Sequence, residues 1–120
     1  MDRIELKKFK RSESKIFTGR PQGEKARAEL RLDDFDKNNE SVDIIIPDDT
    51  FSVNSSFFLG MFQQSIKKLG EERFREKYRF KCNKSLIIDV NIEKNIKICI
   101  LMLNSQQEGI AIWKNGIVNQ

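Results

Sequence analysis

One stretch of this chain decides its fold: Val42-Asp43-Ile44-Ile45-Ile46-Pro47-Asp48-Asp49-Thr50-Phe51-Ser52-Val53-Asn54-Ser55-Ser56-Phe57-Phe58. The first five residues are mostly β-branched and stop at a Pro-Asp-Asp turn, which is typical of a strand buried on both faces. The two serines then open a run whose apolar residues recur at helical spacing as far as Leu69, before Gly70. The stretch therefore predicts a buried strand, a loop and a serine-capped helix.

The residues before this stretch predict short strands and one helix. Small apolar patches within residues 3–9 and at Ile16 and Phe17 indicate an edge hairpin or two short strands. Pro21 suits the first turn of a helix, and apolar residues three to four apart predict a helix from Gln22 to Phe35.

The residues after the stretch continue the alternation of helix and strand. Residues 71–77 are densely charged and predict a short solvated turn of helix, and residues 78–82 alternate apolar with basic side chains as a half-exposed strand does. From Asn91 onward isoleucines at helical spacing predict a last long helix, whose start as early as Ser85 is left open. An Asn-Gly pair within residues 109–118 indicates a terminal hairpin or added edge strand.

These elements together predict an α/β fold in which helices pack against a layered sheet. The chain has 38% hydrophobic and 33% charged residues, which suits a packed interior and a chain that folds by itself. We expect one domain over residues 1–120, with a core of about residues 3–103 and a C-terminal extension over residues 104–120.

Composition argues against most hydrolase mechanisms. The chain has no histidine, which excludes serine–histidine and cysteine–histidine nucleophilic schemes. Cys82 and Cys99 lie far apart without a Cys-x-x-Cys pair, so we assign no metal and expect buried free thiols. We assign no catalytic residue and no cofactor, and we expect the protein not to be an enzyme. No apolar run approaches the length of a membrane span, and the N-terminus lacks a signal-peptide core, so we expect a cytoplasmic protein without a membrane partner.

Three segments carry a resemblance to a known family. They are Thr18-Gly19-Arg20 before a charged helix, the stretch quoted above, and Phe80-Lys81-Cys82-Asn83. Their layout resembles a bacterial STAS-like family of unknown function, which is related to the anti-sigma-factor antagonists. The resemblance implies a STAS-like fold and a regulatory module that binds a partner protein, such as a kinase-like ATPase or a transcription regulator.

The resemblance also implies a site. In the similar antagonists a partner kinase phosphorylates a serine at the helix start, which releases a bound anti-sigma factor, and the corresponding residue here is Ser55, with Ser56 beside it. This chain has asparagine where the antagonists have aspartate before that serine, and phenylalanine where they have glycine. The residues expected to contact a partner around this helix start are Arg20, Asn54, Phe57 and Phe58.

Each feature of this site has a second interpretation. A phosphate at Ser55 would gain from the free N–H groups and the dipole of a helix start. The same serine could equally serve as a simple helix cap. The apolar face that includes Phe57 and Phe58 is either partly exposed for docking or part of the core.

Two other functions remain open. The formal charge is +4, and nucleic acid could bind a basic N-terminal segment containing Lys7, Lys8, Lys10, Arg11 and Lys15. Alternatively, the chain is a structural subunit whose C-terminal tail around Trp113 adds a strand to another sheet. The oligomeric state is not predicted.

Overall fold

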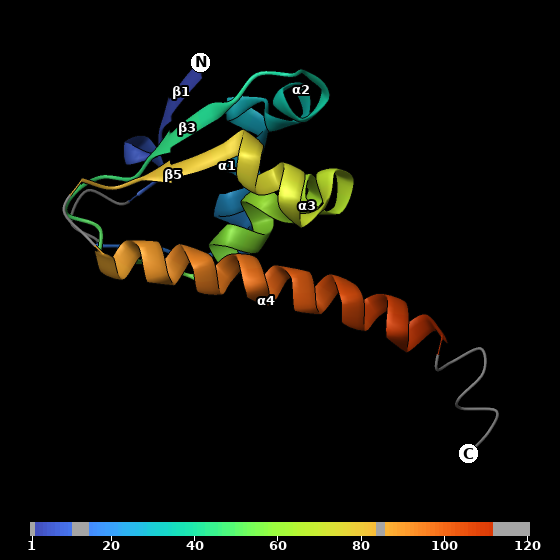
Figure 1. The fold of residues 1–120 in the computed structure, drawn as a ribbon. Coiled ribbons are helices and arrows are strands. Elements are labelled where there is room, and N and C mark those ends of the chain that lie inside the picture. The colour runs from blue at the N-terminus through green and yellow to red at the C-terminus, as the bar shows by residue number, and fades with distance from the viewer. Residues whose placement is uncertain (1, 11–14, 84–85, 112–120) are drawn as a thin grey trace.

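The computed structural model describes residues 2–10, 15–83 and 86–111. It confirms the α/β class, with four α-helices and small parallel sheets in the described part of the chain (Figure 1). The strands are β1 (Asp2–Glu5), β2 (Ile16–Phe17), β3 (Val42–Ile45), β4 (Ser52–Val53) and β5 (Tyr78–Lys81). The helices are α1 (Arg20–Leu30), α2 (Leu32–Lys37), α3 (Ser55–Lys77) and α4 (Leu86–Ala111), with a short 3-10 helix η1 (Lys7–Phe9).

The main sheet has the strand order β1-β3-β5, and both of its pairings are parallel. Side chains alternate across it, so Ile4, Ile44 and Tyr78 are buried under helices that lie on the same side of the sheet (Figure 1). On the opposite face the described charged residues are exposed at the two outer strands: Arg3, Glu5, Arg79 and Lys81. The predicted strand forms β3 and lies in the middle of this sheet. The prediction that it is buried on both faces is wrong, because Asp43 and Ile45 lie half-buried on the open face.

The predicted N-terminal hairpin is wrong, whereas the alternative of two short strands is confirmed. β1 pairs with β3, and β2 pairs in parallel with β4 in a separate two-stranded sheet. Phe17 and Val53 point into the core from this small sheet. The pairing holds the chain immediately before α3 in an extended conformation, so the small sheet sets where α3 begins.

The single helix predicted over residues 22–35 is two helices. Arg31 adopts a left-handed conformation with φ of 56° and ψ of 48°, which ends α1 and redirects the chain into α2. The new direction buries Leu32 and Asp36 against the body. Side-chain periodicity does not signal this break, because the burial of α2 depends on contacts that lie far away in the sequence.

α3 contains the predicted break at Gly70, where φ is 80° and ψ is 165°. The charged segment after it returns to helix as predicted and leads directly into β5. The core between α3 and β5 is aromatic. The Phe62 ring has edge-to-face contacts with Phe74, Tyr78 and Phe80 at centroid distances of 5.2 to 5.5 Å. α3 therefore connects the two sheets through one continuous core.

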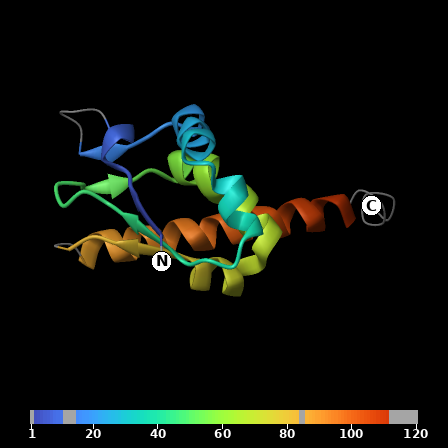
Figure 2. The same ribbon diagram turned by 90° about the horizontal axis from the view of Figure 1, so that it is seen from above.

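α4 packs against α3 and β4, and its second half extends beyond the rest of the body (Figures 1 and 2). It begins at Leu86, and it runs to Ala111, so Gly109, Ile110 and Ala111 are helical and the hairpin predicted from residue 109 is wrong at its start. Residues 112–118 of that predicted hairpin, including Trp113, lie outside the described residues. No helix within the described ranges is both long and apolar enough to cross a membrane.

Candidate functional site at the start of helix α3

The first turn of α3 is capped by asparagine. The Asn54 side chain accepts hydrogen bonds from the Ser56 backbone N–H at 2.9 Å and from the Ser56 hydroxyl at 2.6 Å. Asn54 has extended backbone angles, whereas both serines are already helical. The prediction that Ser55 caps the helix is therefore wrong, and Asn54 fills that role.

Ser55 instead points to α4. Its hydroxyl donates to Oδ1 of Asn95 at 2.9 Å, and the amide nitrogen of Asn95 donates to the Val53 carbonyl at 2.8 Å. The Val53 N–H donates to Oδ1 of Asn91, also at 2.8 Å. Asn91 and Asn95, which we call the asparagine clamp, thus pair with both backbone groups of Val53 and with the first serine of α3.

The asparagine clamp was not among the sites predicted from the sequence. Asn91 and Asn95 are four residues apart, so they lie on one face of α4, and Asn95 is only 3% exposed. Isoleucines at positions 88, 92 and 96 are buried on the same side. Two asparagines at helical spacing within an apolar face would have been a usable signal, because buried amides need hydrogen-bond partners.

Two of the residues predicted to bind a partner are in the core. Phe57 and Phe58 are each 1% exposed. The Phe57 ring packs on Phe17 at 5.2 Å, and the Phe58 ring packs on Phe62 at the same centroid distance. The prediction that Phe57 and Phe58 contact a partner is therefore wrong, since neither ring reaches the surface. The aromatic side chain that is exposed beside this helix start is Phe51, at 62%.

Arg20 and Asn54 are both exposed, but they are not brought together. The Arg20 guanidinium donates to the Gln63 side chain and lies 3.9 Å from the carboxylate of Glu24. Gln63 is nine residues beyond Asn54 and hence about 13 Å along α3. Arg20 therefore borders the middle of α3 and not its first turn.

A buried polar network joins α1, α2, α3 and β5. Arg27 donates to the Met61 carbonyl at 2.9 Å, to Ser65 at 2.8 Å, and to two aspartates. Of these, Asp33 lies 2.6 Å and Asp36 2.7 Å from the guanidinium. The other oxygen of Asp36 accepts a hydrogen bond from the hydroxyl of Tyr78 at 2.7 Å.

The ionisable groups of this network are perturbed by their structural partners. Burial raises the pKa of Tyr78, and its hydrogen bond to Asp36 adds to the effect. The hydrogen bond from Arg27 holds the pKa of Asp33 below its usual range. Burial and the hydrogen bonds within the network therefore account for these shifted pKa values.

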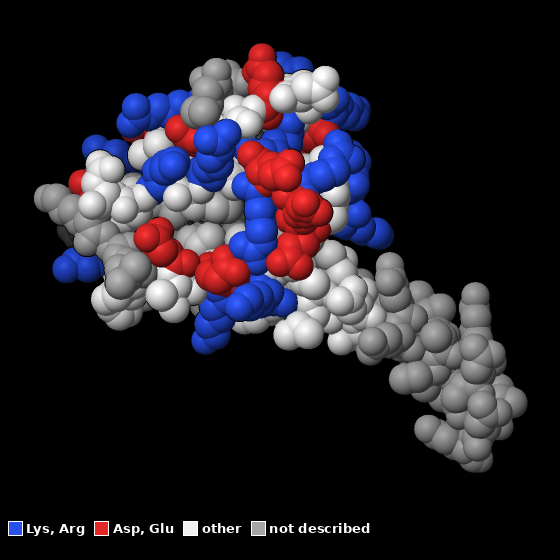
Figure 3. Space-filling view, in the orientation of Figure 1, with Lys and Arg blue, Asp and Glu red and all other residues white. Residues whose placement is uncertain are grey.

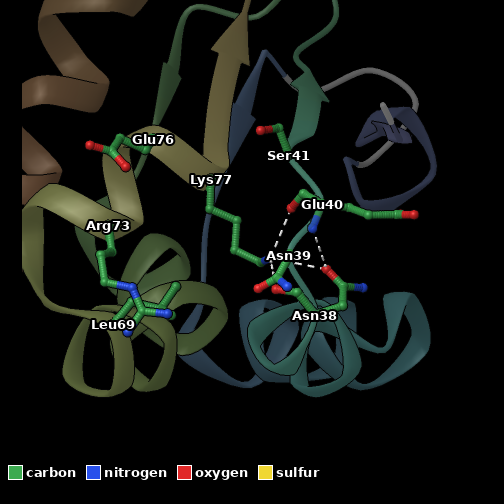
Figure 4. Close-up of a pocket in the computed structure, with 8 residues that line it drawn as sticks. All are labelled: Asn38, Asn39, Glu40, Ser41, Leu69, Arg73, Glu76 and Lys77. Carbon is green, nitrogen blue, oxygen red and sulfur yellow. Dashed lines mark hydrogen bonds between the residues drawn. The ribbon is translucent and has the colours of Figure 1, made fainter.

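A polar hollow of about 230 Å³ lies between the chain before β3 and the C-terminal end of α3 (Figure 4). Lys77 extends across it, and its ammonium group donates to the carbonyls of Asn38 and Glu40 and to the Asn38 side chain, at 2.7 to 3.0 Å. These three bonds match the three donors of a lysine. Burial lowers the pKa of Lys77. The lysine therefore fixes the backbone of this loop.

Whether the described residues could hold a metal ion depends on how their thiols and acids are arranged. Within the described part of the chain, no group of three or more cysteine, aspartate or glutamate side chains is placed to hold a metal ion. Cys99 is fully buried, as predicted, and burial raises the pKa of its thiol to about 11. Cys82 is only partly buried.

The basic N-terminal segment is partly neutralised by acidic side chains. Lys8 lies 3.4 Å from a carboxylate oxygen of Glu29, and Lys10 lies 3.1 Å from Asp49. Arg11 lies outside the described residues. Figure 3 shows basic and acidic side chains interspersed over the body on the visible face. This arrangement favours nucleic-acid binding less than the sequence alone does.

No family model, curated protein or solved structure matches this chain. The STAS-like resemblance therefore rests on the three sequence segments that carry it.

Proposed function

We propose that this chain is a non-enzymatic, STAS-like regulatory module that binds a partner protein at the start of α3. The observation that carries the proposal is the hydrogen bond from the Ser55 hydroxyl to Asn95. It connects a modifiable side chain at a helix start to a second helix, so a chemical change at Ser55 alters the attachment of α4. The perturbed groups Arg27, Asp33 and Tyr78 support a non-catalytic role, because they belong to one structural network of ion pairs and hydrogen bonds.

The proposed contact surface lies next to this hydrogen bond. Phe51 is 62% exposed directly before β4, and the exposed Asn54 and the partly exposed Ser56 follow it. An aromatic side chain beside hydrogen-bonding groups is a frequent composition of protein interfaces. A kinase-like ATPase or a transcription regulator is the kind of partner that the STAS-like resemblance implies.

Phosphorylation of the two serines would have different consequences. A phosphate adds about −1.5 to −2 charges at neutral pH. On Ser55 it would replace the donor to Asn95 with acceptor oxygens facing another acceptor, which loosens the asparagine clamp on Val53. On Ser56 it would stay at the helix start, where the hydroxyl bonds to Asn54, and would change the charge of the contact surface without acting on α4.

The switch is tested by amide hydrogen exchange on Ser55→Glu, Ser55→Ala and Ser56→Glu. We expect Ser55→Glu to accelerate exchange at residues 91–99 of α4 and Ser56→Glu to leave this segment unchanged. Ser55→Ala removes the donor without adding charge, so it should give a smaller acceleration. Equal exchange in the two glutamate variants would refute the switch at Ser55.

The contact surface is tested by quantitative capture of partners on the immobilised chain, comparing wild type with Phe51→Ala and with Gln64→Ala. Gln64 is exposed on α3 and is not part of the proposed surface. A true partner should be lost with Phe51→Ala and kept with Gln64→Ala. If Phe51→Ala retains every protein that the wild type captures, the contact surface is wrong.

A further inference from the structure

α4 has a second apolar face that the body does not cover. Its inner face contributes buried residues to the core: Ile88, Ile92, Asn95, Ile96 and Cys99. On the outer face Ile87, Val90 and Leu101 are 64% to 65% exposed, and Ile98 is half-buried between them. Several large apolar side chains along one exposed helix face mark an interaction surface on a soluble domain.

The second half of α4 carries few charges and extends beyond the rest of the body. The sequence contains no charged residue from Ile98 to Gln107. This half extends past the body in both ribbon views, and Figure 3 shows an uncharged surface on it beyond the last basic side chains. Cys99, Ile100 and Leu103 still pack this half against the core, whereas Leu101 and Met102 are exposed. Because a helix depends for its stability on packing of its apolar faces, the uncovered apolar face is expected to pack on a partner.

The spacing of the outer face identifies the partner. Ile87, Val90, Lys94, Ile98 and Leu101 follow one another at intervals of three, four, four and three residues, which is symmetric about Lys94. A twofold interface requires a patch that is complementary to itself. We propose that two copies of this chain associate through α4 as an antiparallel pair, with the twofold axis at Lys94.

In this arrangement the apolar residues of one copy meet apolar residues of the other. Ile87 faces Leu101 of the second copy, and Val90 faces Ile98 of the second copy. The two α4 helices then overlap from Leu86 to Met102 in each copy, because Met102 lies level with Leu86, where α4 of the second copy begins. The first half of each α4 is anchored to its own body by the asparagine clamp. The exposed apolar face of each α4, from Ile87 to Leu101, thus gains the partner that its own body does not supply.

The flanking charges are compatible with the same pairing. Glu93 and Lys97 lie on one flank of the outer face, and antiparallel helices bring identical flanks together. Lys97 is then about 3 Å along the helix axis from the level of Glu93 in the second copy. Glu93 is held in place by two bonds from Arg75, at 2.7 and 2.8 Å. The two Lys94 ammonium groups repel each other near the axis, so we expect a reversible equilibrium and not a permanent dimer.

Sedimentation velocity over a wide concentration range tests the association. Wild type should pass from monomer to dimer, and Leu101→Glu and Val90→Glu should remain monomeric throughout. Lys94→Leu removes the like charges at the axis and should lower the dissociation constant at least tenfold. Ala28→Glu adds the same charge at an exposed position of α1 and should behave as wild type. A wild type that stays monomeric, or a Leu101→Glu variant that still dimerises, would overturn the proposal.

Cysteine cross-linking in a Cys82→Ser background tests the direction of the helices. Lys94→Cys should cross-link to its own copy. Leu101→Cys should not, because antiparallel pairing places the two Cα atoms about 21 Å apart along the axis. A mixture of Leu101→Cys with Ile87→Cys should cross-link between copies. Efficient cross-linking of Leu101→Cys with itself, without any product in the mixture, would contradict the antiparallel arrangement.

Discussion

The contact between α1 and α3 depends on two glycines, and Gly23→Ala is the sharpest test of it. A Cβ atom at Gly23 would lie 2.1 Å from the Phe57 carbonyl oxygen and 3.0 Å from the Met61 nitrogen. A Cβ atom at Gly60 would lie 2.3 Å from the Arg20 carbonyl oxygen. Both helices thus approach each other so closely that backbone meets backbone.

Two opposing effects determine the size of the change at Gly23. Alanine favours a helix interior over glycine by about 1 kcal/mol. The added methyl group, however, is about 1.3 Å too close to the Phe57 carbonyl for an ordinary contact of 3.4 Å. A backbone oxygen cannot rotate away, so the cost should reach the upper end of the overpacking range, about 3 kcal/mol. The net loss of unfolding free energy is then about 2 kcal/mol, or about 8 °C in Tm.

Urea unfolding of Gly23→Ala, Gly60→Ala and the double variant measures this loss. Because both methyl groups separate the same pair of helices, the double variant should lose less than the sum of the single losses. Ala28→Gly is the control at an exposed position of α1, and it should lose up to about 1 kcal/mol from helix propensity alone. A Gly23→Ala variant that is as stable as wild type would refute the reasoning.

Three further predictions follow from the buried groups and the surface ion pair. Arg27→Met leaves Asp36 charged in the interior and should cost about 3 to 5 kcal/mol in urea unfolding, whereas adding Asp36→Leu should recover part of that loss. In the native protein an aromatic disulfide reagent should label Cys82 quickly and Cys99 only after unfolding, because burial raises the pKa of Cys99 to about 11. The hydrogen bond from Arg75 lowers the pKa of Glu93 below the ordinary value of 4.5. The stabilisation by this pair is therefore present above pH 4.5 and is lost as the pH falls through the lower pKa of the folded state. Glu93→Gln should flatten this acid dependence of the unfolding free energy.

Local sequence patterns predicted the elements whose structure depends on nearby residues. Residues 42–45 form a strand, and the helix that follows the two serines breaks at Gly70, where the sequence predicted its end. The strand at residues 78–81 and the last long helix also agree with their apolar spacing. These features could be predicted because β-branched runs, helical periodicity and glycine act within a few residues.

The features that were missed depend on contacts between distant segments. The first helix breaks at Arg31, and the redirected chain buries Asp36 beside Arg27. No local sequence pattern predicts this contact. Asn54 takes the cap because Ser55 bonds to Asn95 on α4. The roles of the individual side chains at the start of α3 therefore required the tertiary structure.

The parallel pairing of every described strand has a consequence for how the chain folds. Paired residues are 40 apart between β1 and β3, and 36 apart in the other two pairings. Each pairing must therefore close a long loop before it gains any contact energy, which slows folding relative to a fold built from hairpins. During synthesis the first strand has no partner in its sheet until Val42–Ile45 has left the ribosome, so the sheet forms only after that segment has emerged.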